Sequence, residues 1–393
     1  MYFKILFSEK EDLFIYLMPL NVIKRSFKQP KENTIFEVAN IETNKIWWYK
    51  KNSKTSKRTA PGDDYASRNS NNKYTLMASG SDDKTIKIWD LPTGVCIVTL
   101  GGHRGSVTCL AQMNHMIVSG STDATLKIWN IETTSLTNTA KSQCLRTLRG
   151  HEDFITCLNV FPCQISGAHL ASSSIDKTIR LWSMTGRCVR VLNGHSSGVS
   201  CLVLTPCNSL IVSGSWDRTL KVWSLDTGVC LRTLRGHRNG VLSLVLLSNK
   251  EIASGSANTD RTIKIWDFVK GVCLRTLKGH WHAINCLSLM KHINCLVSSA
   301  SSLNSWTKVW DLTRGECVRE LRGPWYVRCM VLVPRTNVAV VSSGEKSVKV
   351  WDLKRDKCLC EFEGHESSVN ALILINGFND EKEEIRNNKK PKT

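Results

Sequence analysis

The sequence lacks an apolar run near its start that is long enough to cross a membrane. The longest one there, residues 13–20, has eight residues, whereas a membrane-spanning helix needs about 20. The four charged residues at 9–12, Glu-Lys-Glu-Asp, directly precede it. A secretory signal would have a positively charged segment in that place, so the segment is a poor match to one. These absences predict an intracellular, cytoplasmic protein with no membrane span.

Acidic residues are also scarce. The chain has 34 Asp and Glu against 53 Lys and Arg, a formal net charge of +19. Such a surface attracts RNA, anionic membranes or acidic proteins, and charge alone does not choose among them. Nine prolines and 24 glycines are too few for a collagen-like or low-complexity chain.

Motifs of enzymes and metal sites are missing as well. There is no phosphate-binding glycine loop, no glycine-rich dinucleotide turn and no metal-ligand set of useful spacing. The short pairs Cys358-x-Cys360 and His280-x-His282 are weak signals for zinc. We therefore predict that the protein is not an enzyme and has no cofactor and no metal.

What is present is a repeat built around tryptophan. Spacings of 40 to 53 residues separate Trp89, Trp129, Trp182, Trp223, Trp266, Trp310 and Trp351. Each ends an alternating segment such as TIKIWD or TLKVWS, the pattern of a β-strand. A small-residue segment such as IVSGS comes before it, and a segment such as CLRTL followed by Gly-His comes after it in most copies. Seven copies in one register predict a repeat fold.

This pattern resembles the WD-repeat β-propeller family over about residues 74–377. The resemblance implies an all-β fold, a seven-bladed β-propeller of four-stranded antiparallel blades. The first blade starts one strand late, and the last segment, GHESSVNALILI, supplies one strand too many for blade 7. We therefore expect residues 368–375 to complete blade 1, so that a C-terminal strand closes the ring.

Residues outside the repeats differ in composition. We predict three parts: 1–73, a basic and partly disordered N-terminal extension; 74–377, the propeller; and 378–393, a disordered charged C-terminal tail. Lysine clusters at 50–58 and 389–392 are either a nuclear address or phosphate patch, or simply solvated tails.

The sixteen cysteines mostly occupy repeat positions, seven at the start of a fourth strand and five in a first strand. Equivalent positions on different blades are too far apart for disulfides. We therefore read them as small apolar residues in a reducing compartment.

The family resemblance also implies a buried hydrogen-bonded set of His, Ser or Thr, Asp and Trp in each regular blade. The pairs are His103 with Asp123, His151 with Asp176, His195 with Asp217, His237 with Asp260, and His365 with Asp83. A Ser-His-Asp catalytic triad is the alternative reading, and repetition over many blades argues against it. Blades 6 and 7 depart from the pattern at Asn304, Pro324 and Glu345, so we expect them to be the softest part of the ring.

Partner binding is expected on the rim that carries the Gly-His loops and the Asp turns, called the top in this family. The candidates are Trp216, Phe154, Tyr326, Arg328, Ile175, Leu242, Leu303, Trp281, Trp325 and Asp82. Trp, Tyr and Arg are enriched at binding hot spots. The alternative is that the aromatic residues pack on neighbouring loops and that Arg328 is an ordinary solvated side chain. The polar insertion at 131–143 is a candidate for a second contact site.

The leading hypothesis of function is a monomeric, non-catalytic scaffold that recognises partner proteins or peptide motifs. One alternative is a substrate-recognition subunit of a ubiquitin ligase, because LRTLRGH and SGSWDRTLKVW resemble repeats of F-box proteins with WD repeats. That reading uses the apolar segment 13–27 as a helix, although no full F-box matches 1–73. A second alternative, favoured by the charge, is an RNA-associated component of a ribonucleoprotein.

Overall fold

The computed structural model describes residues 4–7, 13–16, 35–40, 45–50, 74–131, 144–165, 167–206, 209–300, 306–322, 327–344 and 346–376. Within these ranges the regular elements are β-strands, and no helix is long and apolar enough to span a membrane. The chain divides into two compact units: Met1–Asn72 with Leu91–Gly94, and Lys73–Asp90 with Val95–Thr393.

The first unit contains two short hairpins. β1 (Lys4–Phe7) pairs antiparallel with β2 (Leu13–Tyr16), and β3 (Ile35–Asn40) pairs antiparallel with β4 (Lys45–Lys50). The helix predicted over 13–27 is therefore wrong for 13–16, where aromatic and β-branched residues favour a strand. A helical 5–48 is what the ligase reading requires, and the segments described there are strands. The predicted disorder of 51–73 and 378–393 lies outside the described residues.

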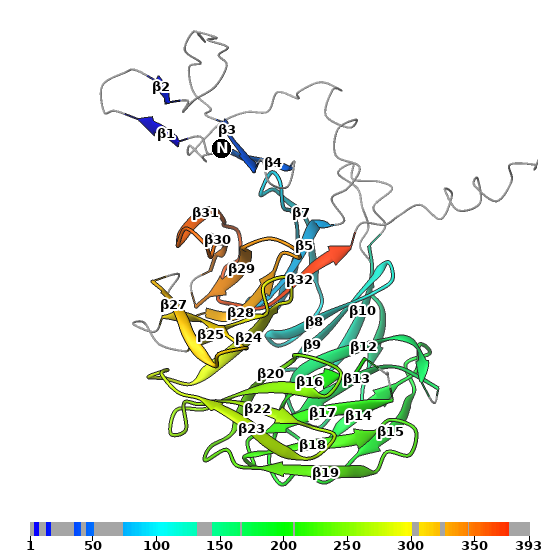
Figure 1. Cartoon of the computed structure of the whole chain (residues 1–393). Coiled ribbons are helices and arrows are strands. Elements are labelled where there is room, and N and C mark those ends of the chain that lie inside the picture. Colours follow the sequence, from blue (N-terminus) through cyan, green and yellow to red (C-terminus); the bar gives the residue numbers. More distant parts are fainter. Residues whose placement is uncertain are drawn as a thin grey trace, which may run out of the picture. The chain divides into compact units, whose positions relative to one another are not determined.

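The second unit is a seven-bladed propeller (Figure 1). Each blade is a four-stranded antiparallel sheet whose first strand lies at the centre and whose fourth is outermost. From the first strand to the fourth, blade 1 contains β32 (Val369–Asn376), β5 (Tyr74–Ser81), β6 (Thr85–Asp90) and β7 (Cys96–Gly101), and blade 2 contains β8 (Val107–Met113), β9 (Met116–Ser121), β10 (Leu126–Asn130) and β11 (Cys144–Leu148). Blade 3 contains β12 (Ile155–Ile165), β13 (Ala168–Ser174), β14 (Ile179–Trp182) and β15 (Cys188–Leu192). Blade 4 contains β16 (Val199–Leu204), β17 (Leu210–Ser215), β18 (Thr219–Ser224) and β19 (Cys230–Arg235).

Blades 5 to 7 follow the same order. Blade 5 contains β20 (Val241–Leu246), β21 (Glu251–Ser256), β22 (Ile263–Asp267) and β23 (Val272–Leu277). Blade 6 contains β24 (Ile284–Met290), β25 (Cys295–Ala300), β26 (Thr307–Asp311) and β27 (Glu316–Leu321). Blade 7 contains β28 (Val327–Leu332), β29 (Val338–Ser343), β30 (Val348–Asp352) and β31 (Lys357–Phe362). The first strands of neighbouring blades contact one another all the way round. The expected fold class is confirmed.

The ring closes through the two ends of the repeat array. β32, the last described strand, pairs antiparallel with β5, from Val369 opposite Ser81 to Asn376 opposite Tyr74. The sheet order β32-β5-β6-β7 confirms that the C-terminal strand completes blade 1. Blade 1 therefore depends on backbone pairing between segments almost 300 residues apart.

The apolar core lies between the blades. One cluster combines Ile179 and Leu181 of blade 3 with Leu202, Ile211 and Trp223 of blade 4, all buried. Alternation explains this arrangement, because one set of strand residues faces each neighbouring blade. The second strands are the most buried; every residue of β9 is buried.

Polar side chains on both the innermost and the outermost strands add contacts between blades. Near the centre, the second residue of each first strand lies at a register shift; Thr156 Oγ1 there donates to Val199 O of the next blade at 2.5 Å. At the outer edge, Arg190 of β15 donates to Asp226 O of blade 4 at 2.5 Å, and Arg275 of β23 donates to Leu312 O of blade 6 at 2.8 Å. In blades 1 and 7 the arginine position holds Val98 and Cys360.

Candidate functional site: the upper rim

A buried chain of hydrogen bonds recurs beneath one rim of the propeller. In blade 4, His195 Nδ1 lies 2.6 Å from Asp217 Oδ2, and His195 Nε2 lies 2.7 Å from Ser213 Oγ. The indole N–H of Trp223 donates to the same Ser213 oxygen at 2.8 Å. The structure makes the same three contacts in blades 1, 2, 3 and 5, around His365 and Asp83, His103 and Asp123, His151 and Asp176, and His237 and Asp260.

In blade 1, the charges of the carboxyl and imidazole groups determine which atom donates each of these hydrogen bonds. Burial opposes ionisation of Asp83, but hydrogen bonds from Thr85, His365 and the Glu366 N–H outweigh it and lower the pKa of the carboxyl to about 2. Burial also lowers the pKa of the His365 imidazole, and Asp83 opposes this only in part. A neutral ring beside an ionised carboxylate must donate from Nδ1 and accept at Nε2. The Ser79 hydroxyl therefore donates to His365 and accepts from Trp89.

The order of these contacts is that of a hydrolytic triad, but the setting is not. A nucleophilic serine must meet its substrate, whereas Ser79 and Ser213 have no exposed surface. Their oxygens already accept from an indole N–H. The sets therefore stabilise the loops, and orphaning one member costs more than the ~1 kcal/mol net value of one bond.

Within the described residues, blades 6 and 7 show only parts of the set. In blade 6, His280 Nε2 lies 2.6 Å from Ser298 Oγ, and Trp310 Nε1 donates to the same oxygen at 2.7 Å. In blade 7, Val341 takes the register position that serine holds elsewhere, opposite Lys349. The replacements noted in the sequence at Asn304, Pro324 and Glu345 lie outside the described residues.

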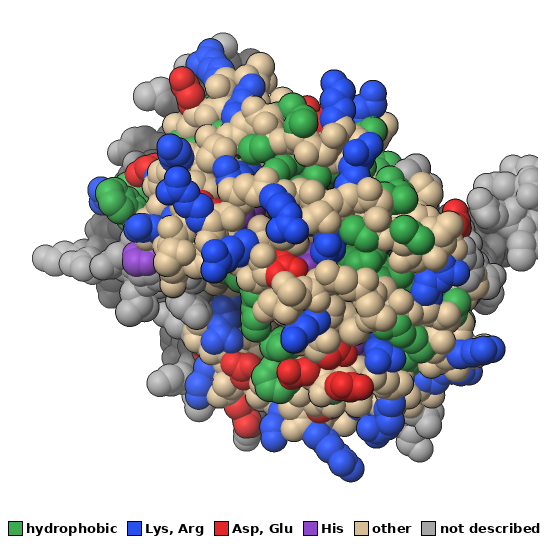
Figure 2. Space-filling model, turned by 90° about the horizontal axis from the view of Figure 1, so that it is seen from below, with side chains coloured by type: hydrophobic (Ala, Val, Ile, Leu, Met, Phe, Trp, Pro, Cys, Tyr) green, Lys and Arg blue, Asp and Glu red, His purple; other side chains and the backbone are tan. Residues whose placement is uncertain are grey.

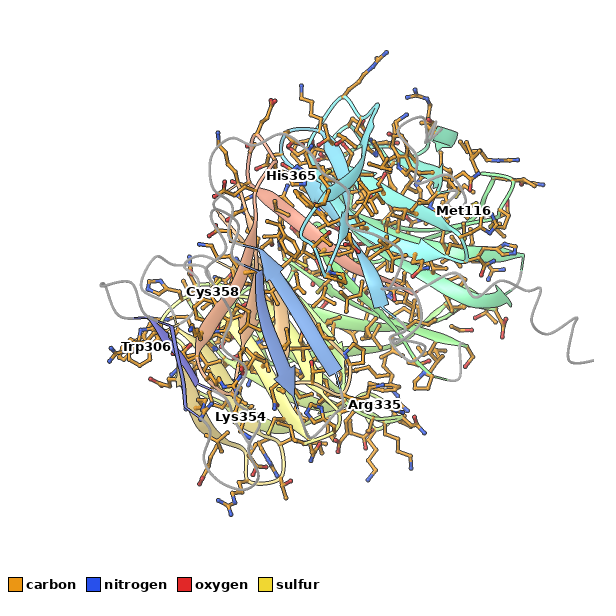
Figure 3. All side chains as sticks on the ribbon, turned by 90° about the horizontal axis from the view of Figure 1, so that it is seen from above. Met116, Trp306, Arg335, Lys354, Cys358 and His365 are labelled. Carbon is orange, nitrogen blue, oxygen red and sulfur yellow. The ribbon has the colours of Figure 1, made fainter. Side chains whose placement is uncertain are left out.

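The loops above these sets form what we call the upper rim. It comprises the entry loops 102–106, 150–154, 194–198, 236–240, 279–283 and 364–368 and the turns 82–84, 122–124, 175–177, 216–218 and 257–261. Figure 3 shows His365, in an entry loop, at the opposite end of the strands from Lys354 and Arg335. Each turn is tied to an entry loop of its own blade, as where Trp216 N donates to Gly198 O at 3.0 Å.

Three predicted contact residues on the upper rim are large, apolar and exposed. The exposed fractions are 46% for Phe154, 44% for Trp216 and 77% for Trp281. Ile175 and Leu242 are half-buried. Leu242 occupies the register shift of β20, the position from which Thr156 reaches its neighbouring blade. Leu303, Trp325 and Tyr326 lie outside the described residues, as do residues 132–143 of the insertion predicted as a second contact site.

Trp216 rests on two glycines from different blades. A Cβ atom at Gly198 would lie 3.2 Å from Trp216 Cε3, and one at Gly240 would lie 3.3 Å from Trp216 Cδ1. A side chain at either position would therefore press against Trp216. The loop packing that was the alternative to partner binding is therefore present in this residue: the inner face of the ring packs on the loops. Nearly half of the residue nevertheless remains exposed.

These contacts continue from blade 3 to blade 6. Ile175 N donates to Phe154 O at 3.0 Å, and a Cβ at Gly198 would lie 3.2 Å from Ile175 Cα. Beyond Trp216, Ala257 N donates to Gly240 O at 2.9 Å. Asn258 Oδ1 then accepts from Ala283 N at 2.7 Å, and Arg261 Nη1 donates to Trp281 O at 3.1 Å. We call this continuous stretch the rim arc. The sequence signal that could have revealed it is the glycine at positions 198 and 240, which leaves room for Trp216.

Arg328 and Asp82 were both predicted to face a partner, and the structure pairs them with each other. Arg328 Nη1 donates to Asp82 Oδ2 at 3.2 Å and to Asn370 Oδ1. Asn370 Nδ2 donates back to Asp82 Oδ1 at 2.7 Å. These bonds join blade 7 to blade 1 near the centre of the ring.

On one face of the molecule, basic residues are distributed rather than gathered (Figure 2). On the face that Figure 2 shows, Lys and Arg side chains are scattered over the whole surface among hydrophobic ones.

The described cysteines are free thiols, and burial raises the pKa of Cys201 and Cys286 to about 12, which makes them poor nucleophiles. Among described residues, no group of three or more His, Cys, Asp or Glu has the geometry to hold a metal ion.

A seven-bladed propeller in which blades 1–5 repeat this His, Ser, Asp and Trp set is a repeat-built β-propeller. The chain belongs to the WD-repeat family: the model "WD domain, G-beta repeat" matches 67–90, 94–130, 142–183, 186–224, 228–267, 271–311 and 315–352. The structure is similar to that of the computationally designed Ika8 protein, with TM-score 0.60 and 33% identity, covering 77% of this chain and 88% of that one.

Curated relatives match shorter stretches. A nuclear distribution protein PAC1 of Coccidioides posadasii is 29% identical over 168 residues, 38% of this chain and 34% of the relative. The human F-box and WD repeat domain containing protein 10B is 35% identical over 142 residues, 28% of this chain and 18% of the relative. The Lissencephaly-1 homolog of Caenorhabditis briggsae is 30% identical over 193 residues, 39% of this chain and 49% of the relative. The chain thus spans less than half the length of these relatives.

Proposed function

We propose that the protein is a non-catalytic scaffold that binds partner proteins through the upper rim. The observation that carries this proposal is the rim arc, where Phe154, Trp216 and Trp281 expose large apolar side chains on loops that are hydrogen-bonded to their blades. Loops held on a packed scaffold are where recognition residues concentrate. Tryptophan in particular is enriched at interface hot spots, where truncation to alanine commonly costs about 2 kcal/mol or more.

Affinity capture from cell extract with the full chain tests this function. The variant carries Phe154→Ala, Trp216→Ala and Trp281→Ala. Its matched control is Leu231→Ala, which removes a side chain 53% exposed on the outer strand β19. We expect the variant to lose the partners that the parent and the control retain, with an unchanged melting temperature. Retention of the same partners by the variant would exclude the rim arc as the binding surface.

The two alternative functions have their own readouts. A ribonucleoprotein component should bind RNA with an affinity that falls steeply as salt rises, because phosphate contacts release counterions. A ubiquitin-ligase subunit, the function class suggested by the F-box name of one relative, should bind an adaptor through residues 1–73. Deletion of 1–73 separates this role from the rim, since the rim arc lies entirely within 150–283.

A further inference from the structure

The exposed charges of the rim arc differ between blade 3 and blades 4 and 5. Over blades 4 and 5, the exposed charged residues of the arc are Arg218, Arg238 and Arg261, and Arg261 Nη1 also donates to Trp281 O at 3.1 Å. Over blade 3 the arc carries exposed Glu152 and half-buried Asp153 beside Phe154, with Lys177 as the cation.

The carboxylates beneath these arginines are already satisfied. Asp217 Oδ1 accepts from Thr219, and Asp217 Oδ2 accepts from the Ser196 N–H at 3.1 Å and lies 2.6 Å from His195 Nδ1. Asp260 Oδ2 accepts from the Arg238 N–H at 2.9 Å, and Oδ1 accepts from Thr262 at 2.8 Å. The side chains of Asp217 and Asp260 are only 6% and 4% exposed, so a ligand above blades 4 and 5 meets arginine side chains rather than carboxylates.

From this juxtaposition we propose that the rim arc binds an acidic segment of a partner protein, with one apolar side chain on Trp216 and carboxylates over blades 4 and 5. The proposal rests on the rim arc being the binding surface. Trp216 lies two residues from Arg218 in sequence and packs against Gly240, which is two residues from Arg238. An apolar anchor and carboxylates a few residues apart in one extended segment therefore fit this region. Arginine also suits carboxylates because its planar donors bind them bidentately.

The ring supplies matched controls for these arginines. Arg104 in blade 2 occupies the same entry-loop position as Arg238, and its N–H likewise donates to a turn carboxylate, Asp123 Oδ2, at 2.8 Å. Lys84 in blade 1 occupies the same turn position as Arg218, and both have left-handed backbones, with φ of 68° and 70°. Charge reversal at either pair changes the total charge equally and perturbs equivalent local structure, but only one pair lies on the rim arc.

The test uses fluorescence polarisation with the full chain and labelled synthetic peptides EESLSEE, KKSLSKK and EESSSEE. We expect EESLSEE to bind at least tenfold more tightly than the other two. Arg218→Glu with Arg238→Glu should weaken it tenfold or more, and Lys84→Glu with Arg104→Glu should weaken it less than twofold. Equal binding of EESLSEE and KKSLSKK, equal losses in the two double variants, or tighter binding of a twelve-residue oligouridine would overturn the proposal.

The same double variants separate this proposal from the function on which it rests. If the alanine variant of Phe154, Trp216 and Trp281 loses its partners but the Arg218 and Arg238 reversal does not, the rim arc binds proteins and its ligand is not acidic. If neither variant loses partners, the proposed function itself fails.

Discussion

Blades 1–5 and blade 7 reach the same four-stranded sheet with different polar contacts. Each of blades 1–5 joins Trp, Ser, His and Asp, whereas in blade 7 Trp351 Nε1 donates to Asp356 Oδ1 at 3.2 Å and the serine position holds Val341. Even so, all seven blades keep the same strand order and the same register irregularity beside the tryptophan. Strand alternation and the apolar core therefore suffice to form a blade, and the hydrogen-bond set adds a tie between its turn and its entry loop.

Truncation should produce the largest effect, because blade 1 has both its strand pairing and its polar set completed by the end of the array. Ending the chain after Glu363 removes His365 and β32 and leaves β5 with an unpaired edge. We expect loss of cooperative thermal unfolding and aggregation of the product. Ending the chain after Phe378 should leave the melting temperature unchanged. A truncated protein that melts cooperatively near the parent temperature would show that blades 2–7 stand without closure.

Side-chain removal should separate the two kinds of blade by a smaller amount. His195→Ala leaves Ser213 and Asp217 buried without their partner, so we expect a loss of about 3 kcal/mol of unfolding free energy. Trp351→Phe in blade 7 removes the hydrogen bond to Asp356 and keeps an aromatic ring, and about 1 kcal/mol should be lost. Urea denaturation measures both. Equal losses would mean that the sets contribute no more than ordinary packing does.

Local opening should differ between the same regions. The softness predicted for blades 6 and 7 means that amide hydrogens of β26 and β30 exchange about tenfold faster than those of β18 and β22, a difference of about 1.4 kcal/mol in opening free energy. Hydrogen exchange read by mass spectrometry resolves these strands. Uniform protection around the ring would contradict this prediction.

Among these predictions, the smallest expected effect is the loss of unfolding free energy that acid causes through His280 in blade 6. Burial, with Lys308 nearby, lowers the pKa of His280 to about 3. The unfolded chain binds this proton below about pH 6.5 and the folded chain does not, so stability falls as pH drops below that value. We expect a loss of about 1 kcal/mol from this residue between about pH 7 and 5.5. His280→Gln should flatten that part of the pH profile, and an unchanged slope would exclude His280 as its source.

The sequence made the blades predictable because their determinants recur. Tryptophan spacing and alternation determined the strands, and the surplus segment after Gly364 pointed to β32 and the closure of blade 1. The rim was harder to predict, since it depends on loop geometry. The turn of blade 5 is two residues longer than that of blade 4. Its Asp260 therefore lies three residues beyond Ala257, which makes the turn-to-loop hydrogen bond, whereas Asp217 directly follows Trp216 in blade 4. Likewise, nothing local in the sequence links Arg328 to Asp82, 246 positions away.

The closure of blade 1 also has a consequence for folding during synthesis, because the two segments that pair are made at different times. Ser79 and His365 meet across 286 positions, and translation at about 5–20 residues per second separates their appearance by about 15 to 60 s. Throughout that interval β5 has an edge with no strand to cover it, at a time when several later blades have already emerged. Exposed strand edges of nascent chains pair with one another. A seven-bladed ring closed by its final strand is therefore most vulnerable to aggregation on the ribosome, and chaperone binding during translation would protect it most at β5.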